Sequence, residues 1–384
     1  MSDSIYVHIP FCETKCPYCD FNSFAVEGRD VDGYIDALVR EFESRGVPSD
    51  PPTVFVGGGT PTVIEPDQID RYLTALTRHF AKNPAREFTV EANPGSLTPA
   101  KVAVLKRHGV NRMSIGAQAF QEKHLRRLGR VHEVRDTEDA WRMAHEGGIE
   151  NVNLDFIFAV PGMVFGEWVD TLARAVDLGA EHLSCYALIF EPGTEFFARR
   201  SAGRMTATPE RLELAMFRYT ERALRLAGLD RYEVSNYARP GLECQHNLRY
   251  WRNESYAGFG AGAFSYQDGE RFGNERNLAR YADRVRATGD AVNTRERLQA
   301  NDAAAETIVL GLRTAKGVSL PEVAERFDVD LQGLFGETIA NLQRGGFLMG
   351  QPEGPAADLR LTRRGWRVAD AVMGEFLGSP RDLQ

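Results

Sequence analysis

The sequence CETKCPYC, from Cys12 to Cys19, carries three of the five cysteines in this chain of 384 residues. Three thiolates in one short loop can hold three irons of a four-iron cluster and leave the fourth iron open for an exchangeable ligand. The alternatives are a zinc loop or inert thiols. Structural zinc sites usually have four protein ligands, commonly in two C-x2-C pairs, and no second pair is present. We therefore expect Cys12, Cys16 and Cys19 to bind a [4Fe-4S] cluster.

The surroundings of this loop carry a resemblance to a known family. A C-x3-C-x2-C loop followed after two strands by a glycine triplet resembles the radical S-adenosylmethionine (radical SAM) enzymes. The stretch from Tyr6 through the cysteines, with GGGTPT at residues 57–62, is similar to the oxygen-independent coproporphyrinogen III oxidase family. The resemblance covers nearly the whole chain. It implies S-adenosylmethionine as a cofactor beside the cluster.

The composition excludes several classes of protein. A hydrophobic content of 43% and a charged content of 26% are those of a soluble globular protein. The net charge of −8 argues against nucleic-acid binding and against simple electrostatic docking to anionic lipid. The longest apolar run, residues 152–165, is interrupted by Asp155 and Pro161 and falls short of the ~18 residues of a membrane span. The N-terminus lacks signal-peptide features, and the few cysteines favour a reducing compartment, so we expect a cytoplasmic location.

Strands and helices alternate along the first half of the chain. Apolar runs predict strands near Ile5–Ile9, Val54–Gly57, Phe88–Ala92, Arg112–Gly116, Val152–Phe158 and Leu183–Leu188. Amphipathic stretches predict helices near Val31–Ser44, Asp67–Phe80, Pro99–Arg107, Glu133–Glu146 and Gly166–Leu178. Such alternation demands parallel pairing with right-handed crossovers. It fits an α/β partial barrel of the (β/α)6 TIM-like kind or an open doubly wound sheet, and the resemblance favours the radical SAM partial barrel, over residues 1–230.

Polar and glycine residues follow several of these strands directly. They are Cys12, Gly57 to Thr60, Glu91 to Asn93, Gln118, Asp155, and Tyr186 to Ala187. Barrel enzymes place their chemistry at the C-terminal ends of the strands, where loops from several strands converge. This arrangement supports a barrel independently of the resemblance.

The remainder of the chain has a different organisation. A long helix is expected over Thr208–Gly228, and residues 231–298 read as an irregular linking region. Residues 299–384 suggest helices near Asp302–Arg313, Ser319–Phe327 and Leu331–Gly345, a hairpin of Phe347–Gly350 and Asp358–Leu361, and a final helix Thr362–Phe376. Three helices with a two-stranded wing suggest a winged-helix-like, α-rich module. Because this module has nine Arg or Lys against twelve Asp or Glu, we expect a cap or protein-contact module rather than a DNA-binding one.

The resemblance implies a set of residues that contact S-adenosylmethionine: Tyr6, Tyr18, Gly58, Gly59, Thr60, Glu91, Gln118, Arg130, Asp155 and Ala187. An arginine suits a carboxylate, and acidic groups suit ribose hydroxyls or an ammonium. Glycine lets the backbone approach a ligand closely. Two alternatives stay open: Tyr18 can shield the cluster rather than cover an adenine, and Arg130 ends a basic surface run.

The chain departs from the oxidase pattern in two places. The oxidase has a fourth cysteine two residues after the third, where this chain has Phe21. The oxidase also has an N-terminal extension, whereas this chain reaches Cys12 almost at once. Both departures argue against coproporphyrinogen oxidase activity and leave open whether the chain is an enzyme.

Residues 244–251, CQHNLRYW, contain H-N-x-x-Y-W, which resembles the haem-binding motif of the family's haem chaperones, the HemW type. A histidine is a good axial ligand for haem iron, and Tyr250 and Trp251 offer flat apolar surface to a porphyrin. The alternative is that His246 simply packs in an aromatic cluster. Cys244 offers a possible further thiolate.

Two functions follow from these patterns. The first is a haem chaperone that binds haem through His246, Tyr250 and Trp251 and passes it to an acceptor, such as a membrane respiratory protein. The second is an oxygen-independent coproporphyrinogen III oxidase, which decarboxylates propionate side chains oxidatively. A radical enzyme with an unrelated substrate is a weaker third hypothesis. A homodimer is compatible with each of them.

Overall fold

The computed structural model describes residues 3–83, 86–350 and 358–377, and these divide into two compact units. The first comprises Met1–Asp230, Tyr237–Leu242 and Ser255–Arg295. The second comprises Arg231–Asn236, Glu243–Glu254 and Glu296–Gln384. Residues 231–298, which we expected to link two modules, are thus distributed over both units.

Six parallel strands form the centre of the first unit. They are β1 (Ser4–Ile9), β4 (Thr53–Gly58), β5 (Glu87–Ala92), β6 (Arg112–Gln118), β7 (Asn151–Phe158) and β8 (His182–Ala187), hydrogen-bonded in that order. Fully buried residues such as Val7, Val54 and Leu154 line these strands. Strands covered on both faces favour such β-branched and aliphatic side chains. The predicted partial barrel is confirmed, with the strand bounds correct to within one or two residues.

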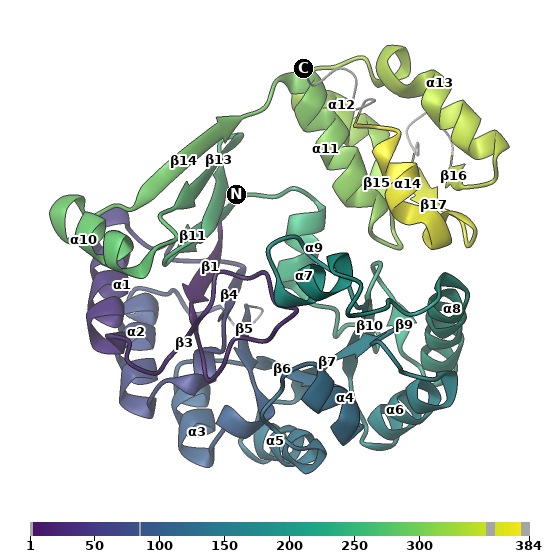
Figure 1. Ribbon diagram of the computed structural model, residues 1–384. Coiled ribbons are helices and arrows are strands. Elements are labelled where there is room, and N and C mark those ends of the chain that lie inside the picture. Colours follow the sequence, from purple (N-terminus) through teal and green to yellow (C-terminus); the bar gives the residue numbers. More distant parts are fainter. Residues whose placement is uncertain (1–2, 84–85, 351–357, 378–384) are drawn as a thin grey trace. The chain divides into compact units, whose positions relative to one another are not determined.

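Five helices cover the outside of these strands (Figure 1). They are α1 (Val31–Arg45), α2 (Pro66–Thr77), α3 (Pro99–Arg107), α5 (Val134–Glu146) and α6 (Phe165–Asp177). Each links one parallel strand to the next, as a crossover must. In α1 the side chain of Asp30 accepts a hydrogen bond from the Gly33 amide at 2.8 Å and so caps the first turn. The short helix α4 (Glu122–Arg127) lies in the connection after β6.

The sheet extends beyond the six predicted strands. On one side β11 (Tyr256–Phe259) pairs in parallel with β1, followed by β12 (Phe264–Gln267), β13 (Glu270–Asn274) and β14 (Val292–Arg297). On the other side β10 (Asn236–Ala238) and β9 (Asp230–Arg231) follow β8. The expectation of an irregular region was wrong here. A Cβ on Gly258 would lie 1.9 Å from the Phe264 carbonyl oxygen, so only glycine fits at this position of the strand. Because glycine has no side chain, the usual strand pattern of alternating apolar residues is not visible in this part of the sequence.

The remaining elements of the first unit connect these layers. The long predicted helix is α8 (Glu210–Leu226), with Pro209 at its N-cap, and α7 (Glu195–Ser201) and α10 (Leu278–Thr288) were not predicted. Two-residue strands β2 (Phe11–Cys12) and β3 (Phe24–Ala25) pair in parallel, and short 3-10 turns η1 (Pro61–Val63) and η2 (Pro94–Ser96) follow β4 and β5.

The second unit contains α9 (Gln245–Trp251), α11 (Ala300–Leu312), α12 (Leu320–Phe327) and α13 (Leu331–Arg344). Its sheet has three strands in the order β15 (Val318–Ser319), β17 (Asp358–Leu361) and β16 (Leu348–Gly350), so the predicted two-stranded wing gains an edge strand. The expected final helix Thr362–Phe376 is instead the 3-10 turn η3 (Gly365–Val368) and the short helix α14 (Ala369–Gly374). A separate core, including Ile308, Leu359 and Trp366, holds the unit together.

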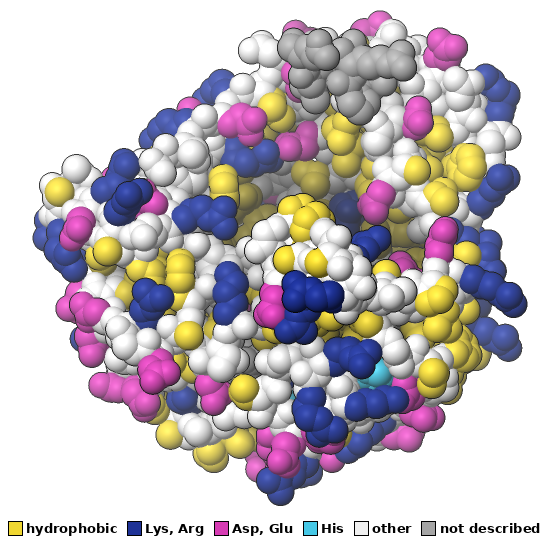
Figure 2. All heavy atoms as spheres, in the orientation of Figure 1, with side chains coloured by type: hydrophobic (Ala, Val, Ile, Leu, Met, Phe, Trp, Pro, Cys, Tyr) yellow, Lys and Arg dark blue, Asp and Glu magenta, His cyan; other side chains and the backbone are white. Residues whose placement is uncertain are grey.

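Acidic and basic side chains are interspersed over the outer helices of the first unit (Figure 2). Among the residues that the structure describes, none of the helices has the length and apolar character needed to cross a membrane.

Candidate functional site

The three cysteines of the CETKCPYC loop line one cavity of about 360 Å³ at the C-terminal ends of the barrel strands. Cys12 belongs to β2, whose pairing with β3 closes the loop at its base. Within the loop the Cys19 amide donates to the Cys16 carbonyl oxygen at 3.1 Å. All three thiols are free and partly exposed. The structure therefore presents three sulfurs to a common space.

Each thiol has a polar neighbour. Thr60 Oγ1 donates to Cys12 Sγ at 3.7 Å, and the Arg130 guanidinium donates to Cys16 Sγ at 3.6 Å. Ser23 Oγ lies 4.0 Å from Cys19 Sγ. Burial raises the pKa of the Cys12 and Cys19 thiols, while hydrogen bonds oppose this rise. Donors aimed at sulfur stabilise thiolates, the form that binds iron. Among the described residues, no three His, Cys, Asp or Glu side chains are arranged around a single-ion site.

Gly58, which ends β4, and Gly59 line the cavity, and contacts within the protein leave no room for a side chain at either position. Gly58 has a φ of 110°, and a Cβ there would lie 2.5 Å from the His8 ring. A Cβ on Gly59 would lie 2.5 Å from the Phe11 carbonyl oxygen. The sequence predicts that glycine here makes room for a ligand. The structure shows a more immediate cause, the close packing of the end of β4 against β1 and the cysteine loop.

Two carboxyl groups from different strands face the cavity. Glu91 on β5 accepts a hydrogen bond from the Gly58 amide at 3.1 Å, and Asp155 lies on β7. Burial, with a contribution from the nearby Asp155 charge, raises the pKa of Glu91 from 4.5 to about 8. The burial of Glu91 thus favours its uncharged form. A cation binding beside it would favour the ionised form.

Arg130 supplies the positive charge of the cavity. Its guanidinium donates to the Gly116 carbonyl oxygen at 3.0 Å and to the side-chain oxygen of Asn93. Although burial alone would lower the pKa of Arg130, its surroundings, including Tyr18 and Cys16, raise it. Arg130 is thus a fixed cation beside the cysteine loop, not the end of an exposed surface run.

Gln118, Tyr18 and Ala187 complete the wall. Gln118 ends β6 with a φ of 63°, next to an irregularity in the register between β6 and β7. Such a conformation is uncommon for a residue other than glycine and is concentrated at functional sites. The Tyr18 ring lies 6.2 Å from that of Phe196, and Ala187 ends β8.

Nearly all the residues predicted to contact S-adenosylmethionine are thus brought together. The cavity lining includes Tyr18, Gly58, Gly59, Thr60, Glu91, Gln118, Arg130, Asp155 and Ala187 as well as the three cysteines. Tyr6 is set apart from this lining: its hydroxyl shares a hydrogen bond of 2.9 Å with His8 Nδ1, and its ring stacks on Phe55.

The sequence reasoning missed Ser114 and Ile189, which also line the cavity. A serine inside an apolar strand was the only available signal for Ser114. The outer part of the lining includes three exposed apolar side chains, Phe21 at 60%, Ile189 at 64% and Tyr186 at 41% exposure. Phe21, which stands where the oxidase pattern has its fourth cysteine, therefore presents an apolar ring and not a thiol.

The candidate haem motif lies on α9 in the second unit. His246 is 1% exposed, and its Nε2 shares a 2.9 Å hydrogen bond with Tyr250 Oη. The Trp251 ring packs beneath the Arg313 guanidinium, 4.6 Å from the ring centre, and Arg249 forms an ion pair with Glu254 at 2.5 Å. In this conformation Nε2 of His246 is engaged. Iron ligation by that atom therefore requires the contact with Tyr250 to open.

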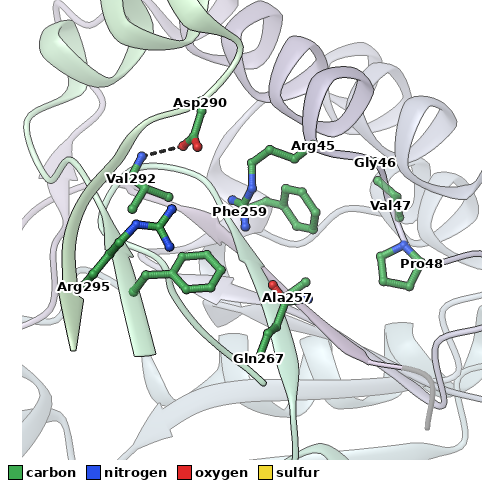
Figure 3. Close-up of a pocket in the computed structure, with 11 residues that line it drawn as sticks. Arg45, Gly46, Val47, Pro48, Ala257, Phe259, Gln267, Asp290, Val292 and Arg295 are labelled. Atoms are coloured by element: carbon green, nitrogen blue, oxygen red, sulfur yellow. Dashed lines mark hydrogen bonds between the residues drawn. The ribbon is translucent and has the colours of Figure 1, made fainter. Parts of the chain in front are cut away.

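A second cavity of about 440 Å³ lies between the end of α1 and strands β11 to β14 (Figure 3). Two arginines line it. Arg45 donates to Glu41 at 2.7 Å and to the Gly258 carbonyl oxygen at 2.8 Å, and Arg295 pairs with Glu270 at 2.7 Å. Because both guanidinium groups already have carboxylate partners, we assign no ligand to this cavity.

Comparison with protein families places the two parts of the chain. A family model described as the radical SAM superfamily matches residues 6–175, and one described as the HemN C-terminal domain matches residues 298–368.

Similar proteins span the whole chain. The heme chaperone HemW of Bacillus subtilis (strain 168) is 36% identical over 379 residues, which cover 98% of this chain and 99% of that protein. The heme chaperone HemW of Mycobacterium tuberculosis (strain ATCC 25618 / H37Rv) is 32% identical over 97% of this chain and 94% of that protein. The solved structure of coproporphyrinogen III oxidase (HemN) from Escherichia coli, a radical SAM enzyme, matches with a TM-score of 0.84 at 23% identity. This match covers 97% of this chain and 89% of that one. At this identity the structural likeness establishes the fold.

Proposed function

Because the chain belongs to the heme chaperone HemW family, within the radical SAM superfamily, we propose that it is a haem chaperone. It binds haem and transfers it to an acceptor protein, for which a membrane respiratory protein is our first candidate. The protein carries a [4Fe-4S] cluster and S-adenosylmethionine in the barrel. It acts in the cytoplasm, where its few cysteines remain reduced, and a homodimer is compatible with this role.

The proposal that the protein binds these cofactors rests on one observation: three thiols, two carboxyl groups and one guanidinium line the same cavity. They belong to Cys12, Cys16, Cys19, Glu91, Asp155 and Arg130. Three thiols fit a four-iron cluster with one open iron. When bound, the cluster and S-adenosylmethionine supply one-electron chemistry. Thr60 and Arg130 donate to the sulfurs. Arg130 also attracts a carboxylate, and the two acidic groups accept from an ammonium or from ribose hydroxyls.

The haem part is supported by family membership and by the helix α9. His246 and Tyr250 lie one turn apart on α9, and Trp251 follows directly. His246 would hold the haem iron through Nε2 once its hydrogen bond with Tyr250 opens. The two aromatic rings supply apolar surface to the macrocycle.

The rival function is coproporphyrinogen oxidation. The exposed Phe21 at the position of the oxidase's fourth cysteine disfavours it, because this position offers no thiolate. The cavity residues alone do not separate the two functions, since both use the same cofactors.

Anaerobically reconstituted protein tests both functions in one experiment. We expect stoichiometric haem uptake, transfer of the haem to an apo-acceptor, and no decarboxylation of coproporphyrinogen III above background. Decarboxylation at a substantial rate by protein whose His246→Ala variant still binds haem normally would replace the chaperone with the oxidase.

A further inference from the structure

A row of polar side chains crosses the interior of the barrel where apolar residues are the rule. Ser114 on β6, Asn153 on β7 and His182 on β8 are register partners on adjacent strands. Their exposures are 6%, 2% and 1%. Burying polar groups costs free energy unless they are hydrogen-bonded. Asp155, two residues beyond Asn153 on the same strand, points to the same side because side chains alternate along a strand.

The row is connected to the Asp155 carboxylate at both oxygens. The Asn153 amide nitrogen donates to Asp155 Oδ1 at 2.8 Å and to Ser114 Oγ at 2.7 Å. Ser114 Oγ in turn donates to Asp155 Oδ2 at 2.9 Å. The side chains of Asn153 and Ser114 therefore each donate to one oxygen of the carboxylate. Its remaining lone pairs are available to donors in the cavity that it lines.

The orientation of the Asn153 amide is set from the other side. Its oxygen lies 2.6 Å from His182 Nδ1 and accepts from Ser184 Oγ at 3.1 Å. A carboxylate only accepts, so the amide group that faces Asp155 is the nitrogen, and the amide oxygen faces His182. His182 Nδ1 must then carry a proton. Burial, assisted by the charge of Arg112, lowers the pKa of His182 well below its usual value, so the ring is neutral with its proton on Nδ1.

We propose that Asn153 and His182 are positioning residues that clamp the Asp155 carboxylate so that it accepts hydrogen bonds from a diol, the ribose hydroxyls of a nucleoside ligand. The inference rests on the proposed binding of S-adenosylmethionine in this cavity and adds residues that do not themselves touch the ligand. Without a donor at position 182, the Asn153 amide oxygen keeps only the hydrogen bond from Ser184. The amide is then held less firmly, and the Asp155 carboxylate loses part of its fixed orientation.

A matched pair of variants tests the clamp. In His182→Asn the new amide nitrogen can occupy the place of Nδ1, whereas in His182→Gln it reaches the place of Nε2. We expect wild-type protein with a full cluster to bind S-adenosylmethionine about tenfold more tightly than its 2′-deoxyribose analogue, since a hydrogen bond to a charged group has about that effect. His182→Asn should keep this ratio. His182→Gln should reduce it to within about twofold, with iron content unchanged.

A second measurement does not depend on ligand binding. Nitrogen-15 spectra of histidine-labelled wild-type protein should show His182 as the neutral Nδ1–H form from about pH 5 to about pH 8, whereas an unperturbed histidine would change its charge in this range. The Nε2–H form, or a wild-type binding ratio in His182→Gln, would overturn the clamp while leaving the proposed function intact. If cluster-loaded wild-type protein fails to bind S-adenosylmethionine, the proposed cofactor and the clamp fall together.

Discussion

The barrel cavity and helix α9 both contain side chains that the sequence marks as ligand-binding, but the two regions differ in readiness. In the barrel, three thiols, two carboxyl groups and Arg130 already face a shared cavity. On α9, His246 is buried and bonded to Tyr250. The barrel residues sit on strand ends that a parallel sheet must bring to one edge. Helix α9 has seven residues and does not bring residues from several elements together. A sequence motif on it therefore does not predict a prepared binding site, as the motifs at the strand ends do.

The largest effect should come from the cysteine loop. Cys16→Ala removes one iron ligand, so anaerobic reconstitution should leave no stable four-iron cluster, as counted by iron and sulfide analysis. Cys185→Ala is the matched control, because Cys185 is a buried residue of β8 outside the cavity lining. A full complement of four irons in Cys16→Ala would show that Cys16 does not bind the cluster. The barrel cavity would then not be a preformed cluster site.

The next effect concerns the pH dependence of stability in the ligand-free protein. The pKa of Glu91 is about 8 in the folded chain and 4.5 ordinarily, so between these values the folded state holds a proton that the unfolded state releases. Stability should therefore fall as pH rises through this window, by up to about 1.4 kcal/mol per pH unit.

Glu91→Gln should flatten this dependence, which urea unfolding at about pH 5, 6.5 and 8 measures. Parallel profiles for the wild-type protein and the variant would mean that Glu91 is ionised in the folded protein. The cavity would then be less desolvated than the structure indicates.

On α9, His246→Ala should lower haem affinity at least about tenfold and shift the absorption spectrum of bound haem, because it removes the iron ligand. Cluster content should be unchanged. His79→Ala, which removes an exposed imidazole from the first unit, is the control. Equal spectra for wild-type protein and His246→Ala would show that His246 is only a packing residue.

The smallest effect should come from Tyr250→Phe. This variant keeps the aromatic ring but removes the hydroxyl that holds His246 Nε2. Releasing one neutral hydrogen bond should raise haem affinity by about fivefold. Titration of haem into wild-type and variant protein measures this. A weaker affinity would mean that the hydroxyl contacts the ligand, and α9 would then be as well prepared as the barrel cavity.

The sequence predicted the barrel well and the strands flanking it poorly. The strands β1 and β4 to β8 are buried on both faces and so appear as apolar runs with helices between them. Strand β11 is only four residues long and contains Gly258, and it is stabilised by its pairing with β1 rather than by its own pattern. Local sequence carries little signal for a strand whose neighbours supply its hydrogen bonds.

The sequence by itself determined the cysteine loop, the six-stranded barrel and the set of residues at the strand ends, because spacing and strand polarity are local properties. The tertiary structure alone decided three further points: that Gly58 packs against His8, that Ser114, Asn153 and His182 form one row, and that His246 is bound to Tyr250. The Gly58 contact and the polar row depend on the register between strands, and the His246 contact depends on side-chain orientation. Register and orientation are set by packing between residues, so they cannot be read from the identity of a single residue.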